Sequence, residues 1–206
     1  MWILPSRGRP ANVQRFIDHC YISNGMPASL LLCIDNDDSC LQQYIQLNLP
    51  NGWHIRVDER TNCNEILNKV FNSHKNEPFY GIVSDDVVPE SSGWNTRLED
   101  VAGNDGLAYG DDGINGSKLA THPCFGGNII RERGYIALPG LQRLYADNVW
   151  TTTAEEDGVL RYVEDVKLTH YHFSNGKAPK DATYEKRHCV AQDKQIYNEW
   201  LNSRKK

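Results

Sequence analysis

The chain has 206 residues, 39% of them apolar and 24% charged, a composition that fits one folded domain and not a disordered protein. Its 22 basic and 27 acidic side chains give a net charge of −5, which argues against a general nucleic-acid coating protein. No apolar run is long enough to cross a membrane, no leader peptide is visible, and no Cys-x-x-Cys pair occurs. We therefore expect a cytoplasmic protein with reduced thiols and no membrane insertion.

The first half of the chain alternates short apolar runs with segments of helical periodicity. We predict strands at 2–4, 30–34, 53–57 and 79–83, and helices at 10–21, 41–45 and 66–71. This order predicts a single α/β domain with a mainly parallel sheet flanked by helices. Ligands of such sheets bind at the carboxyl ends of the strands, and polar clusters stand at those ends here.

The second half is less regular. Five glycines within 103–116 predict loops around a short strand at 107–109, and Asp111-Asp112-Gly113 predicts a turn. Helical patterns follow near 140–146 and 153–163, then a strand at 166–173. A terminal helix is predicted at 184–203, with these side chains facing inward: Val190, Ile196, Tyr197, Trp200 and Leu201.

The sequence Ser84-Asp85-Asp86 follows a strand that we expect to be buried. Adjacent carboxylates repel each other unless a cation neutralises them. Oxygen ligands suit Mg²⁺ or Mn²⁺, which often bind through one or two carboxylates and substrate phosphates. A helix cap or a solvated loop is the structural alternative for this pair.

Two further segments carry candidate chemistry. His170 and His172 point to the same face if they lie in a strand, and either could complete a metal site begun by Asp86, while Lys177 follows in a glycine-bearing loop. Half-buried histidines without a ligand role are the alternative. Asp147, near Trp150 at the start of a helix, is a candidate general base or an ordinary N-cap.

These pieces together resemble a GT-A-fold nucleotide-sugar glycosyltransferase of family 2 type. The resemblance rests on Ile-Leu-Pro-Ser-Arg-Gly-Arg-Pro at the start, Cys-Ile-Asp-Asn-Asp-Asp after the second strand, and Val-Ser-Asp-Asp-Val-Val-Pro after the fourth. The late segment His-Tyr-His-Phe-Ser-Asn-Gly-Lys resembles the ending of compact phage-encoded members, which would place the protein in the host cytoplasm. The likeness covers most of the chain in order.

The resemblance implies a donor half at 1–104 and an acceptor half at 105–206, with a metal and phosphate loop and a terminal helix in the latter. It implies a role in donor binding for these residues: Pro5, Ser6, Arg7, Asp35, Asn64, Asn68, Asp85 and Lys177. Asp86, with His172 or His170, would hold Mn²⁺ or Mg²⁺, and Asp147 would be the catalytic base. Ser84 departs from the family's Asp-x-Asp motif at its first position.

The implied activity is metal-dependent transfer of a sugar, hexose or pentose, from a nucleotide-diphosphate donor, a UDP-sugar by preference. With Asp147 as the base the anomeric centre would be inverted, and a retaining outcome is open if Asp147 is not the base. The acceptor hydroxyl belongs either to a glycan or to a hydroxylated base in phage DNA. For DNA, three aromatic residues (Phe125, Tyr135 and Trp150) would stack on an extruded base. Seven cations would meet phosphates: Arg131, Arg133, Arg143, Lys177, Lys180, Lys186 and Arg187.

Two other classes stay open from the sequence. One is a non-catalytic nucleotide- or sugar-binding module, which the serine at position 84 would fit. The other is a metal-dependent phosphoesterase built on Asp35, Asp85, Asp86 and the two late histidines. The oligomeric state is open as well.

Overall fold

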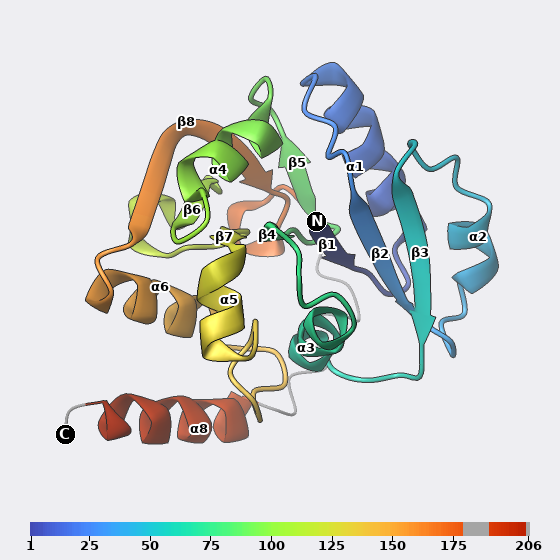
Figure 1. Cartoon of the computed structure of the whole chain (residues 1–206). Helices are drawn as coiled ribbons and strands as arrows, with labels where there is room; N and C mark the ends of the chain where they lie inside the picture. The colour runs from blue at the N-terminus through green and yellow to red at the C-terminus, as the bar shows by residue number, and fades with distance from the viewer. Residues whose placement is uncertain (179–189, 205–206) are drawn as a thin grey trace.

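The computed structural model describes residues 1–178 and 190–204 (Figure 1). Its first half alternates strands and helices as predicted. The elements are β1 (Trp2–Pro5), α1 (Pro10–Ile22), β2 (Leu30–Asp35), α2 (Leu41–Ile45), β3 (Trp53–Asp58), α3 (Cys63–Ser73) and β4 (Phe79–Ile82). Pro10 opens α1, where a backbone N–H would have no partner within the helix, and Asn62 caps α3 by accepting the N–H of Glu65.

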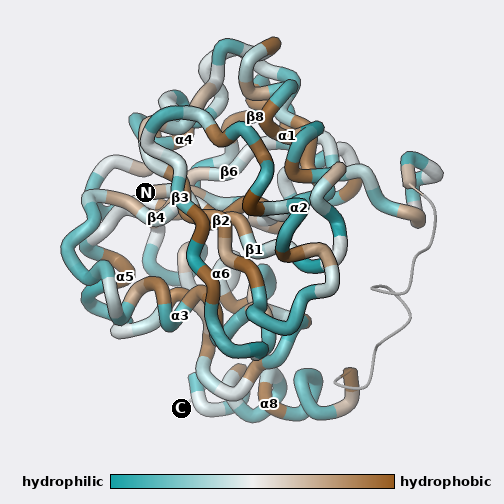
Figure 2. The backbone as a smooth tube through the Cα atoms, turned by 90° about the vertical axis from the view of Figure 1, so that its right-hand side faces the viewer, coloured by the Kyte–Doolittle hydropathy of each residue, from teal (hydrophilic) through white to brown (hydrophobic). Residues whose placement is uncertain are grey.

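These four strands are parallel and lie in the order β3-β2-β1-β4. Every residue of β2 is buried, as its unbroken apolar run predicts. Side chains alternate on β1, so Trp2 and Leu4 pack with α1 and α4 while Ile3 packs with α3. One hydrophobic core therefore lies on each face of the sheet. Figure 2 shows hydrophobic residues concentrated along these strands.

The second half extends the sheet with strands of both directions. Its elements are β5 (Val87–Pro89), α4 (Trp94–Ala102), β6 (Leu107–Asp111), β7 (Cys124–Gly126), α5 (Gly127–Arg133), α6 (Ala146–Glu156), β8 (Leu160–His170) and α8 (Val190–Ser203). The full order is β3-β2-β1-β4-β7-β6-β8-β5. β7 is antiparallel to β4 and β6, whereas β6 and β8 are parallel. The prediction of a single α/β domain with a mainly parallel sheet is confirmed.

Strand β8 lies between β6 and β5, and its register against β6 shifts midway. Gly110 pairs with Val163, but the next residue, Asp111, pairs with Lys167. Val166 lies so close to the shift that a Cβ on Gly110 would be 2.4 Å from its carbonyl oxygen. After the shift β8 runs antiparallel to β5 and ends at His170, which pairs with Val87 directly after the acidic turn.

The structure corrects several predicted elements. One helix, α6, replaces the helices predicted near 140–146 and 153–163, because Gly158, at φ +69°, follows the end of α6 and β8 begins at Leu160. Helix α4 was not predicted. Residues 184–189 of the predicted terminal helix lie outside the described residues. Within α8 the predicted inward residue Val190 is 36% exposed, whereas Asp193 is fully buried.

Helix α8 lies at the bottom edge of the molecule in Figure 1, below α6. The buried carboxylate of Asp193 fastens it to the loop before α6. It accepts three backbone N–H groups at 2.8–3.0 Å, those of Gln142, Arg143 and Leu144. Among the described helices, none combines the length and apolar content that crossing a bilayer requires.

Candidate functional site

The polar side chains that follow β1, β2 and β4 meet at one edge of the sheet. Ser6, after β1, donates its hydroxyl to Oδ2 of Asp85, after β4, at 2.6 Å, and its Oγ lies 2.8 Å from the hydroxyl of Tyr44. Tyr44 also accepts the backbone N–H of Arg9 at 2.8 Å. Buried Tyr44 thus holds the segment after β1 in place, and Ser6 of that segment contacts the acidic turn.

Asp85 and Asp86 are both buried, at 5% and 7% exposure. Burial and the neighbouring charge of Asp86 raise the pKa of Asp85 to about 6, against the opposing effects of Ser6 and Arg9. Nη1 of Arg9 lies 3.2 Å from Oδ1 of Asp85 and 3.6 Å from Oδ2 of Asp86. One guanidinium therefore contacts both carboxylates of the turn.

His170, at the end of β8, reaches the same acid pair. Its Nε2 lies 3.2 Å from Oδ1 of Asp86, and the N–H of Tyr171 donates to the backbone carbonyl of Asp86 at 2.7 Å. Burial disfavours the protonated ring, but the hydrogen bond and charge of Asp86 outweigh it and raise the pKa of His170. The ring of His172 is 5.2 Å from that of His170.

The end of β2 forms a second cluster. Arg7 donates to Oδ2 of Asp35 at 2.7 Å and to Oδ1 of Asp37 at 2.6 Å. The other carboxylate oxygen of Asp35 and the side-chain nitrogen of Asn64, in the first turn of α3, are both buried without a hydrogen-bond partner. Buried polar atoms are rarely left unsatisfied, so each of these two atoms has an unused hydrogen-bonding capacity.

The acids of the two clusters have different cationic partners. Arg7 holds Asp35, whereas Arg9 contacts Asp85 and Asp86. Across the described ranges, no three acidic, histidine or cysteine side chains are gathered as a ready-made metal site. Asp86 and His170 nevertheless supply an oxygen and a nitrogen of the right chemistry, and a cation between them would draw its other ligands from water or a substrate phosphate.

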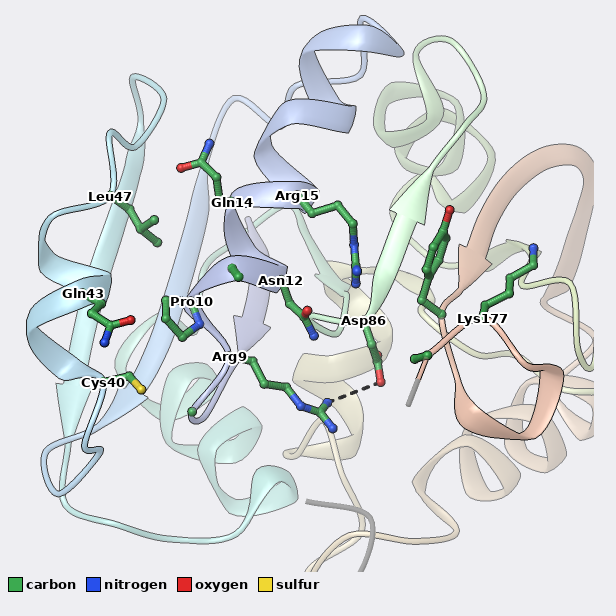
Figure 3. Close-up of a pocket in the computed structure, with 14 residues that line it drawn as sticks. Arg9, Pro10, Asn12, Gln14, Arg15, Cys40, Gln43, Leu47, Asp86 and Lys177 are labelled. Carbon is green, nitrogen blue, oxygen red and sulfur yellow. Dashed lines mark ion pairs between the residues drawn. The ribbon is translucent and has the colours of Figure 1, made fainter. Parts of the chain in front are cut away.

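A cleft of about 630 Å³ opens beside the acid pair, lined by the start of α1, by α2 and by the segment after β8. Arg9 and Asp86 point toward each other in it, whereas the ammonium of Lys177 points away from Asp86 (Figure 3). The guanidinium of Arg15 lies 4.7 Å from the Tyr171 ring and the Lys177 ammonium 5.7 Å. The cleft is therefore rich in cations.

Asp147 occupies the first turn of α6. Its Oδ1 accepts the N–H of Asn148 at 2.9 Å, and burial raises its pKa, the direction that suits a proton acceptor. Asn68 joins α3 to the backbone of residues 136–137. Its amide donates to the carbonyl of Ala137 and accepts the N–H groups of Ile136 and Ala137, at 2.8–3.0 Å.

The aromatic residues considered for base stacking lie mostly in the core. Phe125 is fully buried and Trp150 is 6% exposed, with their rings 5.5 Å apart, so neither can stack on an extruded base. Among the candidate cations, Arg133 pairs with Asp157 at 3.2 Å, and Arg131 donates to the carbonyl of Glu77. Lys180, Lys186 and Arg187 lie outside the described residues.

Sequence reasoning missed Arg9 and His122. Arg9 stands in the opening motif, and a basic residue that soon follows β1 could have been paired with the acids after β4. No pattern marks His122, which lies between elements. Burial lowers the pKa of His122 to about 4, so its ring is neutral. The predicted turn at Asp112 is confirmed, since this carboxylate accepts the N–H groups of residues 114–116.

No protein-family model matches the sequence, and no curated protein matches it. Solved structures do match in fold. A mannosyltransferase from Pyrobaculum calidifontis, PcManGT, in complex with GDP-Man and Mn²⁺, has a TM-score of 0.66 at 12% identity over 88% of this chain. Glucosyl-3-phosphoglycerate synthase from Mycobacterium tuberculosis, in complex with Mn²⁺, UDP and phosphoglyceric acid, has 0.57 at 11% identity over 83%.

A third match is S. aureus TarS 1-349 in complex with UDP, with a TM-score of 0.59 at 10% identity over 81% of this chain. The aligned region covers 57% of the mannosyltransferase, 70% of the synthase and 58% of the TarS chain. At these identities the comparisons confirm the predicted GT-A fold.

Proposed function

We propose that this protein is a metal-dependent glycosyltransferase that takes a sugar from a nucleoside-diphosphate donor, a UDP-sugar by preference. The observation that carries the proposal is the buried acid pair Asp85–Asp86, in contact with His170 at the carboxyl edge of a GT-A-type sheet. Two similarly folded proteins form complexes with Mn²⁺ and GDP-Man or with Mn²⁺ and UDP, which supports the same ligand class for this site.

The unpartnered atoms support a pyrimidine as the base. Oδ1 of Asp35 is an acceptor and Nδ2 of Asn64 is a donor, both buried. The imide edge of uracil offers an N–H between two carbonyl groups, which complements that pair. Cytosine would also satisfy both atoms, with its amino N–H on Asp35 and its ring nitrogen accepting from Asn64, so the pair supports a pyrimidine base.

Asp86 and His170 would hold the divalent cation, whose contribution is to stabilise the negative charge of the departing diphosphate. Ser6 and Arg9 hold Asp85 beside it. Lys177 has to turn from Tyr171 to meet a phosphate. Asp147 would accept the proton of the acceptor hydroxyl, since burial raises its pKa in the direction that suits a general base. Attack from the side opposite the diphosphate would invert the anomeric centre.

A saccharide hydroxyl is the acceptor we propose ahead of a DNA base. The net charge of −5 and the buried positions of Phe125 and Trp150 both favour this order. DNA binding that weakens with salt would reverse it.

Calorimetric titration of UDP with and without Mn²⁺ tests the donor site. We expect micromolar binding that needs Mn²⁺ and loss of metal-dependent binding in Asp86→Ala. GDP serves as the comparison nucleotide because guanine also carries a ring N–H. Absence of binding by every nucleotide would refute the proposal.

Release of UDP from UDP-sugars then separates an enzyme from a binding module. Asp147→Asn should keep UDP affinity and lose transfer. Binding of UDP without release from any UDP-sugar would favour the binding module, and cleavage of a generic phosphodiester would favour the phosphoesterase.

A further inference from the structure

His122 lies at the sheet edge that carries the acid pair. It precedes β7, which is antiparallel to β4 with Cys124 beside Gly81. The N–H of Ile82 donates to the carbonyl of Pro123 at 2.8 Å. The residue before Pro123 is therefore placed next to the end of β4, just before the chain turns into Ser84-Asp85-Asp86.

Three features of His122 are unusual for a residue with only a structural role. Its φ is +50°, which is uncommon for a residue with a Cβ and is further disfavoured before proline. Its Nε2 is buried with no hydrogen-bond partner. Its ring stands edge-on to that of His170, with centroids 5.2 Å apart. Strained backbone and unsatisfied polar atoms persist mainly where a function needs them.

Asp112 fixes the two histidines relative to each other. Its carboxylate accepts the hydroxyl of Thr121, the residue before His122, at 3.1 Å. Its backbone carbonyl accepts the N–H of His170 at 2.9 Å. Since Asp112 is itself buried and held by its own turn, the backbones that carry the two rings have a common support, while the rings keep their own side-chain torsions.

We propose that His122 is a further residue of the metal centre and that its Nε2 is reserved for the divalent cation bound by Asp86 and His170. This inference rests on the proposed function. A neutral imidazole nitrogen is a common metal ligand, and His122 would supply one from the ring that stands against His170. Because the described side chains do not already form a set of three ligands, the ring has to shift toward the cation on binding.

The test separates the nitrogen from the ring that carries it. His122→Phe keeps an aromatic ring against His170 but removes both nitrogens. We would measure Mn²⁺ affinity in the presence of UDP from the electron paramagnetic resonance signal of free Mn²⁺. We expect His122→Phe to bind Mn²⁺ at least tenfold more weakly, with a Tm in EDTA no lower than that of the wild type. His54→Phe, at an exposed position on β3, is the matched control and should bind as the wild type does.

Unchanged Mn²⁺ affinity in His122→Phe would overturn the inference, because packing alone would then explain the residue. If phenylalanine prevents folding, His122→Asn serves instead, since asparagine tolerates a positive φ, and the same tenfold loss is expected. The proposed function fails separately, when the wild type itself binds no Mn²⁺ with UDP. Binding by the wild type, loss in Asp86→Ala and no loss in either His122 variant would refute only the inference about His122.

Discussion

Replacement of Asp85 by asparagine tests whether the ionised acid pair lowers the free energy of unfolding. Burial and the charge of Asp86 raise the pKa of Asp85 from 3.8 to about 6. One pH unit corresponds to about 1.4 kcal/mol, so the ionised carboxylate destabilises the folded state by about 3 kcal/mol above pH 6. Below about pH 4 both folded and unfolded chains bind the proton, and this cost vanishes.

We therefore expect Asp85→Asn to exceed the wild type in unfolding free energy by up to about 3 kcal/mol at pH 8 and to equal it near pH 4. The amide keeps an oxygen for the hydroxyl of Ser6, and Arg9 keeps its contact with Asp86. The gain in stability should be accompanied by weaker Mn²⁺ and UDP binding, because the pair loses one negative charge.

Urea unfolding followed by tryptophan fluorescence, from pH 4 to pH 8 in EDTA, provides the measurement. Asp100→Asn, at an exposed position on α4, is the control and should change stability by less than about 0.5 kcal/mol. A variant that is less stable than the wild type at pH 8, or a difference that does not depend on pH, would refute the reasoning.

Three further predictions concern other parts of the molecule. Asp193→Ala should lower the unfolding free energy in urea by about 3 kcal/mol, because three backbone N–H groups lose their acceptor; a loss below about 1 kcal/mol would contradict the anchoring role. Gly81→Ala should lower the Tm, at a cost of about 1–3 kcal/mol, since its Cβ would lie 2.3 Å from the Trp2 ring; an unchanged Tm would show that the ring can move. Mn²⁺ affinity should fall as the pH drops through the raised pKa of His170, because a protonated imidazole cannot bind metal; constant affinity from pH 8 to pH 5.5 would exclude His170 as a ligand.

The donor-side strands could be predicted because their signals are local. The run at Leu30–Asp35 is apolar without a break, and only a strand buried on both faces explains it at that length. The helix expected over 153–163 was wrong because apolar residues in a partly exposed, bent strand such as β8 recur at mixed spacing. The local signal against a continuous helix was Gly158, which ends α6.

Site residues that come soon after a predicted strand in the sequence could be predicted. Site residues that reach the sheet edge through pairing between distant strands could not. Asp86 follows β4 directly, so its place at the sheet edge could be inferred from the sequence. His122 reaches that edge because β7 is antiparallel to β4, a pairing without a sequence motif. Asp193 was overlooked on α8 because its partners, three N–H groups near Gln142, come from a loop about fifty positions earlier in the chain.

The register shift in β8 also limits which insertions and deletions the protein can accept. The three residues between Val163 and Lys167 have no partner on β6, so a change in the number of residues there need not alter the pairing on either side. After Lys167 a change in length would alter the pairing, because successive side chains of a strand point to opposite faces. A single-residue deletion after Lys167 would turn the side chains of Thr169 and His170 to the opposite faces of the sheet. The imidazole of His170 would then no longer contact Asp86. Homologous chains that keep this chemistry should therefore vary in length before Lys167 and not between it and His170.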